Sequence, residues 1–300
     1  MTSLPDLFPG FAERRLDGDA GSIFLRIGGD GPPLALVHGF PQTHVEWHRV
    51  AGELAKRFTV VAMDSRGYGQ SAAPSSRQGE LYSKRAVGAD IARIMQALGY
   101  AKFSVVGHDR GARVGYRLAL DHPERIAKLA LLDIMPTIAM WEGMSAQRAM
   151  QVYHWSFLAQ PYPLPEMLIA REPVAYIDHT LASWTKLNSL AAFDERALAH
   201  YRAFFSEPAR IHACCEDYRA GATVDVEHDR ADREAGATIQ CPTLILWGDA
   251  GIPAAGGGPL DIWRRTFTPG AIGQGIDSGH FLPEENPQAT LAALMPFLLA

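Results

Sequence analysis

Short apolar runs recur along the first half of the chain, and stretches with helical spacing separate them. From Val87 to Leu98, apolar residues fall at helical intervals, and a second helical pattern opens at Gly111, directly after one of the runs. Each run is apolar enough to form a strand that is buried on both faces. The runs cover residues 22–28, 33–38, 59–64, 102–108 and 127–133. This alternation predicts an α/β fold in which helices cover a mostly parallel sheet.

The pattern changes after about Pro136. The next segment is rich in Trp, Tyr, His and Met, with helix-like stretches and no convincing strand. Strand patterns return at 241–247 and, weakly, at 271–276, and we expect a final helix from about Pro287. A run of small residues at 254–258 lies between them, and we assign it no function. The predicted parts are a core in two pieces, residues 1–136 and 236–300, and a helical cap at residues 137–235.

The composition is typical of a globular protein, with 47% hydrophobic and 20% charged residues among 300. The 28 basic and 33 acidic side chains give a net charge of -5, so we expect neither nucleic acid nor an anionic membrane as a partner. The N-terminus has no signal-peptide pattern, which favours a cytoplasmic protein. Because Cys214, Cys215 and Cys241 lack the spacing of metal ligands, we expect reduced thiols and no metal site.

The sequence GHDRG at 107–111 lies where a predicted strand runs into a predicted helix. Glycines flanking a central residue at such a tight turn are typical of a nucleophile elbow, here with Asp109 in the usual place of serine. An ordinary turn aspartate fits the same pattern, so the choice between the two interpretations depends on the other motifs. HGFP at 38–41 follows a strand, and His280 lies near the end of the chain. This order is that of a nucleophile followed by a catalytic histidine.

On these and further motifs the chain resembles the α/β-hydrolase superfamily. It is most similar to the branch with an aspartate nucleophile, which contains haloalkane dehalogenases, epoxide hydrolases and, as the nearest match, fluoroacetate (haloacetate) dehalogenases. The matching segments are LFPGF (7–11), LVHGFPQTH (36–44), GHDRGARVGYRLALD (107–121), YHWSFLAQP (153–161), CEDYRAGA (215–222) and SGHFLPEE (278–285). The resemblance implies an α/β-hydrolase core with a helical cap, no cofactor, a small haloacid substrate and a homodimer.

An aspartate nucleophile suits displacement at a saturated carbon. The carboxylate of Asp109 would form an alkyl ester, and a water molecule activated by His280 would then hydrolyse that ester. In enzymes of this kind the oxyanion hole consists of backbone N–H groups, here those of Phe40 and Arg110.

Two residues are candidates for the acid that orients His280. Asp133 ends a predicted strand, whereas Asp249 follows the strand at 241–247. In many α/β hydrolases the acid would fall on the position of Gly251, which cannot serve. This departure favours Asp133 over Asp249, and fluoroacetate dehalogenases are similar in placing the acid after the earlier strand.

Arg110 and Arg113 distinguish members of the branch. A desolvated guanidinium beside the nucleophile would be costly in a site for neutral haloalkanes, but two of them can hold a substrate carboxylate. Surface ion pairs are the alternative for these arginines. The resemblance further implies that His154, Trp155 and Tyr218 bind the departing halide with N–H and O–H donors, although packing of the cap would explain them too.

We therefore expect a hydrolase that converts 2-haloacetates to glycolate and halide. An epoxide hydrolase of the same fold and a non-catalytic ligand-binding protein are the alternatives. His38 and His108 would brace the turns around Asp109, and Trp184 would either line the pocket or pack in the core.

Overall fold

The computed structural model describes residues 4–251 and 258–300, so most of the small-residue run at 254–258 lies outside the described residues. Within them, eight strands form one sheet in the order β1-β2-β4-β3-β5-β6-β7-β8. The strands are β1 (Ala12–Gly18), β2 (Gly21–Gly28), β3 (Pro33–Val37), β4 (Thr59–Met63), β5 (Phe103–His108), β6 (Ile126–Leu132), β7 (Thr243–Gly248) and β8 (Ile272–Ile276). β2 is antiparallel to β1 and β4, and the remaining pairs are parallel, which confirms the predicted mostly parallel sheet.

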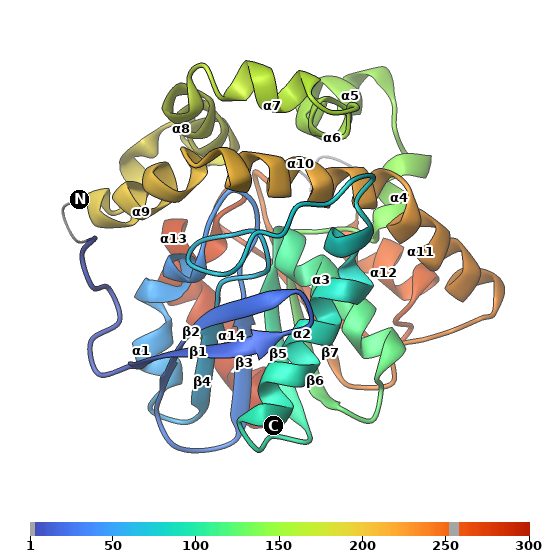
Figure 1. Cartoon of the computed structure of the whole chain (residues 1–300). Coiled ribbons are helices and arrows are strands. Elements are labelled where there is room, and N and C mark those ends of the chain that lie inside the picture. The colour runs from blue at the N-terminus through green and yellow to red at the C-terminus, as the bar shows by residue number, and fades with distance from the viewer. Residues whose placement is uncertain (1–3, 252–257) are drawn as a thin grey trace.

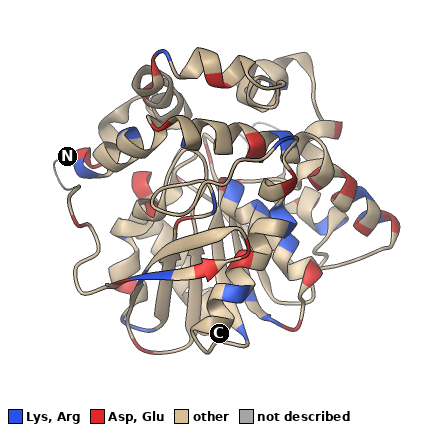
Figure 2. Cartoon of the chain, in the orientation of Figure 1, with Lys and Arg blue, Asp and Glu red and all other residues tan. Residues whose placement is uncertain are grey.

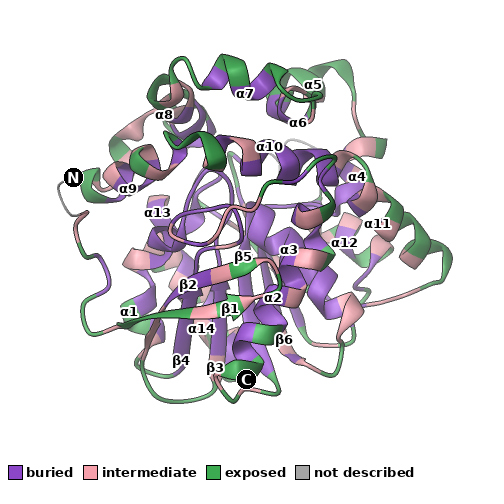
Figure 3. Cartoon of the chain, in the orientation of Figure 1, coloured by how far each residue is buried: buried purple, intermediate pink, exposed green. Residues whose placement is uncertain are grey.

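Burial follows position in the sheet. The central strands β3, β4 and β5 are almost entirely buried, as their apolar runs predict (Figure 3). The prediction of two buried faces was wrong for β2, which lies next to the edge strand β1 and has exposed or half-buried residues at both ends. The sequence pattern did not reveal β1 itself, because its residues AERRLDG are polar and mostly exposed.

Helices cover both faces of the sheet (Figure 1). α2, α3 and α12 pack one face, with Val87, Val114 and Trp263 in its apolar cluster. η1, α1 and α14 pack the other face, with Trp47 and Leu294 in a second cluster. The bounds of the helices around the sheet are η1 (His44–Arg49), α1 (Ala51–Leu54), η2 (Glu80–Tyr82), α2 (Lys84–Ala97), α3 (Asp109–Asp121), α12 (Pro259–Thr266), α13 (Leu282–Glu285) and α14 (Pro287–Leu299).

A run of helices between β6 and β7 lies over the carboxyl ends of the parallel strands (Figure 1). Its outermost members, α5 and α7, expose much of their surface (Figure 3). The helices of this cap are α4 (Thr137–Glu142), α5 (Ala146–Gln151), α6 (Tyr153–Leu158), α7 (Leu164–Ile169), α8 (Pro173–Trp184), η3 (Leu190–Ala192), α9 (Glu195–Phe205), α10 (Pro208–Ala222) and α11 (Val224–Glu234).

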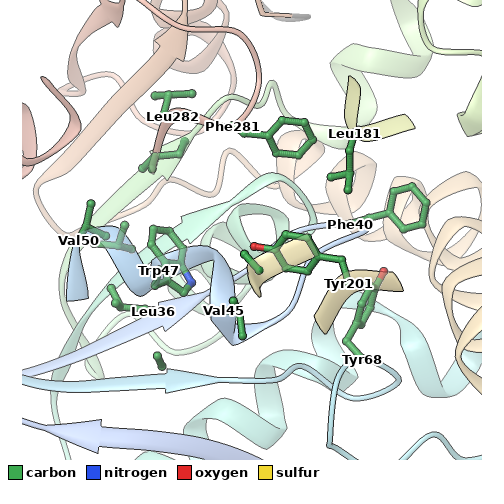
Figure 4. Packing of buried hydrophobic residues seen from close by; sticks show 14 of the residues in the cluster. Leu36, Phe40, Val45, Trp47, Val50, Tyr68, Leu181, Tyr201, Phe281 and Leu282 are labelled. Atoms are coloured by element: carbon green, nitrogen blue, oxygen red, sulfur yellow. The ribbon is translucent and has the colours of Figure 1, made fainter. Parts of the chain in front are cut away.

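The cap shares an apolar core with the sheet. Phe40, from the loop after β3, lies among Leu181 and Tyr201 of the cap and Phe281 near the end of the chain (Figure 4). All four side chains are fully buried. The cap is therefore packed directly on the loops that follow the strands.

Charged side chains of both signs are spread over the core and the cap (Figure 2). In the described part of the chain, no helix has both the length and the apolarity required to cross a membrane. The three cysteines, Cys214, Cys215 and Cys241, form no disulfide.

Candidate active site

Asp109 occupies a sharp turn between β5 and α3. Its backbone has a φ of 45°, in the left-handed region that L residues rarely adopt. The flanking glycines make the turn possible: a Cβ on Gly107 would lie 2.6 Å from Ala112 Cα, and one on Gly111 would lie 2.2 Å from the carbonyl oxygen of Val37. The strand and helix thus approach too closely for any larger residue, and the Asp109 side chain projects from the turn.

The two carboxylate oxygens of Asp109 have different surroundings. Oδ1 accepts a hydrogen bond of 2.9 Å from the backbone N–H of Phe40. Oδ2 lies 3.9 Å from His280 Nε2, beyond hydrogen-bond distance. Burial opposes ionisation, but the neighbouring His280 and Arg110 outweigh it and lower the pKa of Asp109 below its usual value. Asp109 is therefore an ionised carboxylate, and among the described residues its Oδ2 has no hydrogen-bond donor.

Asp133 rather than Asp249 contacts the histidine. Asp133 Oδ2 accepts a 2.6 Å hydrogen bond from His280 Nδ1, and its Oδ1 accepts one of 2.8 Å from the backbone N–H of Gly248. A Cβ on Gly251 would lie 2.5 Å from Asp133 Oδ1, so the carboxylate fills the space that a side chain at 251 would need. Asp249 is exposed.

His108 joins the loops that carry the site. Its Nε2 donates a 2.8 Å hydrogen bond to the backbone carbonyl of His280, and its Nδ1 lies 3.0 Å from Glu46 Oε1. Glu46 Oε2 accepts from the backbone N–H of Gly39, beside Phe40. Burial alone would lower the pKa of His108, but Glu46 raises it to about 9. A buried charged pair therefore connects the Phe40 loop, the elbow and the His280 loop.

Arg110 is buried and paired with an acid that sequence reasoning missed. Its Nε and Nη2 donate to the carboxylate of Asp217 at 3.1 and 2.8 Å, and Nη2 also donates to the Asp217 carbonyl at 2.7 Å. Burial opposes the charge, but Asp217 raises the pKa of Arg110 well above its usual value. Only the position of Asp217 beside Tyr218 in the sequence hinted at such a role.

Arg113 lies one turn further along α3. Among the described residues, its hydrogen-bond partners are all neutral. Its Nη1 donates to the carbonyl of Met135 and to Thr137 Oγ1, both at 3.0 Å. The guanidinium carbon lies 4.5 Å from the centre of the Trp155 ring. Burial and the charge of Arg110 lower the pKa of Arg113. The alternative of a surface ion pair is wrong for Arg113, which is 3% exposed.

The three cap residues lie together above these arginines. His154 and Trp155 of α6 have ring centres 5.6 and 6.3 Å from that of Tyr218 on α10. Trp184 lies between His154 and His280, with ring centres 4.4 and 5.2 Å away, so it lines the site. Burial, together with the nearby arginines, lowers the pKa of His154 to about 3, and burial beside Asp109 raises that of Tyr218 well above its usual value. Both side chains are thus neutral.

Several buried polar atoms near Asp109 have no hydrogen-bond partner among the described residues. They are Arg110 Nη1, Arg113 Nε, His154 Nδ1, Tyr218 Oη and His280 Nε2. Other buried polar atoms of the described residues are unpaired too, but these five lie around one carboxylate, which is the arrangement expected where a ligand completes a site. In the described part of the chain, no group of three or more His, Cys, Asp or Glu side chains is arranged to hold a metal ion.

A separate cavity of about 1170 Å³ lies between the 73–78 segment, α7 and α10. Four of its lining side chains pair with one another: Glu166 accepts hydrogen bonds from Arg219 and contacts His212, and Arg219 also donates to Glu216. None of the residues around Asp109 lines it. None of the unpaired polar atoms near Asp109 belongs to a residue that lines this cavity, so we take Asp109 as the centre of the candidate active site.

Comparison with known proteins identifies the family of the chain. The family model described as alpha/beta hydrolase fold matches residues 32–287. The chain is 40% identical to a fluoroacetate dehalogenase from Burkholderia sp, over 97% of this chain and 95% of that protein. It is 30% identical to a soluble epoxide hydrolase from Corynebacterium sp. (strain C12), over 90% and 91% of the two chains.

The crystal structure of ALR0039 from Nostoc sp PCC 7120 superimposes with a TM-score of 0.92 at 49% identity, covering 96% of this chain and 98% of that one. The family model spans most of the chain, and both relatives match nearly end to end. The chain belongs to the α/β-hydrolase family and is a hydrolase.

Proposed function

We propose that the protein hydrolyses 2-haloacetates to glycolate and halide through a covalent ester on Asp109. The observation that carries the proposal is the Arg113 guanidinium, which is buried close to the nucleophile and forms no ion pair within the described residues. A buried charge without a counter-ion is costly, and a substrate carboxylate supplies the missing anion. The name of the 40% identical relative supports the same substrate class.

In the first step, the substrate carboxylate binds Arg113 and the free Nη1 of Arg110, which directs the halogen-bearing carbon toward Asp109. Asp109 Oδ2 attacks, because Oδ1 is held by the Phe40 N–H. The carbon–halogen bond breaks, and the halide leaves with its electron pair. Donors from His154, Trp155 and Tyr218 replace the water that would hydrate it.

In the second step, water between His280 Nε2 and Asp109 attacks the ester carbon. His280 accepts the proton, and Asp133 at Nδ1 stabilises the imidazolium. Oδ1 becomes the oxyanion, already hydrogen-bonded to the Phe40 N–H, and the Arg110 N–H at the start of α3 is the second donor. Collapse of this intermediate releases glycolate and restores Asp109. The balance is haloacetate plus water giving glycolate, halide and a proton.

Epoxide hydrolysis is the second candidate, because one relative is a soluble epoxide hydrolase. The same nucleophile and histidine would serve, and Tyr218 would donate to the epoxide oxygen. A neutral epoxide, however, leaves Arg113 without a counter-ion. The arginine therefore favours the haloacid.

Ion chromatography tests the proposal. The purified protein is incubated with fluoroacetate, chloroacetate, a neutral chloroalkane and an aryl epoxide, and halide, glycolate and diol are measured. We expect equal amounts of halide and glycolate from the haloacetates and little product from the neutral compounds. Diol formation without halide release would replace the proposal with epoxide hydrolysis. Saturable binding without any product would indicate a ligand-binding protein.

A further inference from the structure

Asp217 on the cap helix α10 collects donors from three separate parts of the core. Arg110 donates to both its carboxylate oxygens and to its carbonyl. The phenol of Tyr68 donates to Oδ2 at 2.8 Å, and the ammonium group of Lys84 pairs with Oδ1. Asp217 is 4% exposed, and Lys84 and Arg110 are buried with it. A single cap carboxylate thus links α10 directly to the elbow.

The same contacts determine where Arg110 points. Its Nε and Nη2 are both engaged by Asp217, so the planar guanidinium cannot rotate, and Nη1 is left without a partner among the described residues. The guanidinium carbon lies 4.3 Å from the centre of the Tyr218 ring. Because Tyr218 directly follows Asp217 in α10, the contacts of Asp217 hold two groups in place: Arg110, which donates to the substrate carboxylate, and Tyr218, which donates to the halide.

The charges around Asp217 also balance. Lys84 Nζ lies 3.5 Å from Asp225 Oδ2 as well as contacting Asp217, so Arg110 and Lys84 are matched by two aspartates. Arg113 has no such match in the described part of the chain. Arg110 therefore orients the substrate while its own charge is balanced by an aspartate, whereas Arg113 supplies the unbalanced positive charge of the site.

We propose that Asp217 is a positioning residue for the reaction: it orients Arg110 and aligns Tyr218 over the nucleophile without touching the substrate. This inference rests on the proposed haloacetate hydrolysis. A misplacement of about 1 Å in a substrate-orienting group can cost on the order of a hundredfold in rate. Loss of Asp217 therefore reduces kcat rather than weakening substrate binding.

The test compares Asp217→Asn with Asp225→Asn. Both substitutions remove one negative charge from a buried cap aspartate that contacts Lys84, but Asp225 has no contact with Arg110. We expect kcat for chloroacetate to fall about tenfold to a hundredfold in Asp217→Asn, with KM unchanged or lower because the site gains positive charge. In Asp225→Asn, kcat should stay within about twofold of the unmodified protein.

Asp217→Glu keeps the charge but lengthens the side chain. It should lower kcat and leave KM unchanged, and it provides a second variant if Asp217→Asn does not fold. Thermal unfolding of each variant measures its folding separately from kcat. Equal kcat in folded Asp217 variants and Asp225→Asn, or a rise in KM alone, would overturn the inference. Absence of haloacetate turnover in the unmodified protein would instead overturn the proposed function.

Discussion

The hydrolytic side of the site and the substrate side differ in how completely the protein pairs their polar groups. On the hydrolytic side, Asp133 accepts from His280 and from Gly248, and His108 holds the His280 backbone. On the substrate side, Arg113 Nε and Tyr218 Oη are buried without partners among the described residues.

This difference indicates which groups the fold completes and which a ligand completes. A fully paired group is held in one orientation before substrate arrives, whereas an unpaired buried donor lowers stability until an anion reaches it. The unpaired His280 Nε2 fits the same rule, because its proposed partner is the hydrolytic water. Substitutions on the two sides should therefore change activity and stability in different ways.

The largest effect is expected on the hydrolytic side. Asp133→Asn removes the acceptor that fixes the tautomer of His280, so turnover of chloroacetate should fall about a thousandfold or more. Asp249→Asn is the matched control and should leave turnover nearly unchanged, because Asp249 is exposed. Steady-state kinetics of the two variants decides which aspartate is the acid that orients His280. A severe loss in Asp249→Asn alone would move the acid to that residue.

The next effect separates activity from stability. Arg113→Met removes the charge that binds the substrate carboxylate, and kcat/KM for haloacetates should fall about a hundredfold, since a hydrogen bond to a charged group contributes about 1.5–3 kcal/mol. The same substitution removes an unpaired buried cation, so the free energy of unfolding should rise by about 1 kcal/mol.

Arg117→Met is the control for that prediction. Arg117 is equally buried on the same helix but is paired with Asp121 and Asp232. Its removal takes a partner from Asp121 and Asp232, which are half-buried, and Asp121 keeps its pair with Arg85, so the free energy of unfolding should fall by about 1 kcal/mol. Urea unfolding measures both values. Equal destabilisation of the two variants would contradict the view that Arg113 awaits a ligand.

A smaller effect is expected from single halide donors. Fluoride concentrates its charge more than chloride and depends more on donated hydrogen bonds, so Tyr218→Phe or Trp155→Phe should lower kcat/KM for fluoroacetate about tenfold more than for chloroacetate. Tyr153→Phe is the control, because that side chain lies half-exposed on the same helix as Trp155. If the ratio of the two specificity constants does not change in either donor variant, these residues only pack the cap.

The last prediction concerns the dependence of stability, rather than activity, on pH. Burial, with the nearby arginines, lowers the pKa of His154 to about 3, whereas in the unfolded chain it is about 6.5. Below about pH 6.5 the unfolded state binds a proton that the folded state does not, so the free energy of unfolding falls by at most about 1.4 kcal/mol per pH unit toward pH 3. His154→Phe should reduce this acid sensitivity in urea unfolding at pH 7 and pH 4.5. If the free energy of unfolding falls equally between pH 7 and pH 4.5 in the unmodified protein and in His154→Phe, His154 is not buried in its neutral form.

The sequence was most informative where local rules apply. The apolar runs predicted the central strands, and the flanking glycines predicted the turn at Asp109, because both depend on neighbouring residues. Gly251 favoured Asp133 as the acid, because the usual acid position falls on Gly251 and a glycine has no carboxylate. The polar edge strand β1 was missed because it buries too little to leave a hydrophobic pattern.

The pairing of Arg110 with Asp217 could not be predicted in the same way. The two residues are 107 positions apart, in the core and the cap, and their contact exists only after the cap has packed on the elbow. The same holds for the neutral partners of Arg113. Which arginine carries net charge therefore depends on tertiary structure, although the sequence indicated that both lie near the nucleophile.

Mass spectrometry of the intact His280→Asn variant after incubation with chloroacetate tests the covalent mechanism most directly. If His280 acts only on the ester, the variant should release one halide per active site and gain one carboxymethyl group, and combining it with Asp109→Ala should abolish the modification. An unmodified His280→Asn protein that releases no halide would contradict the two-step mechanism. A modification that persists without Asp109 would contradict the assignment of the nucleophile.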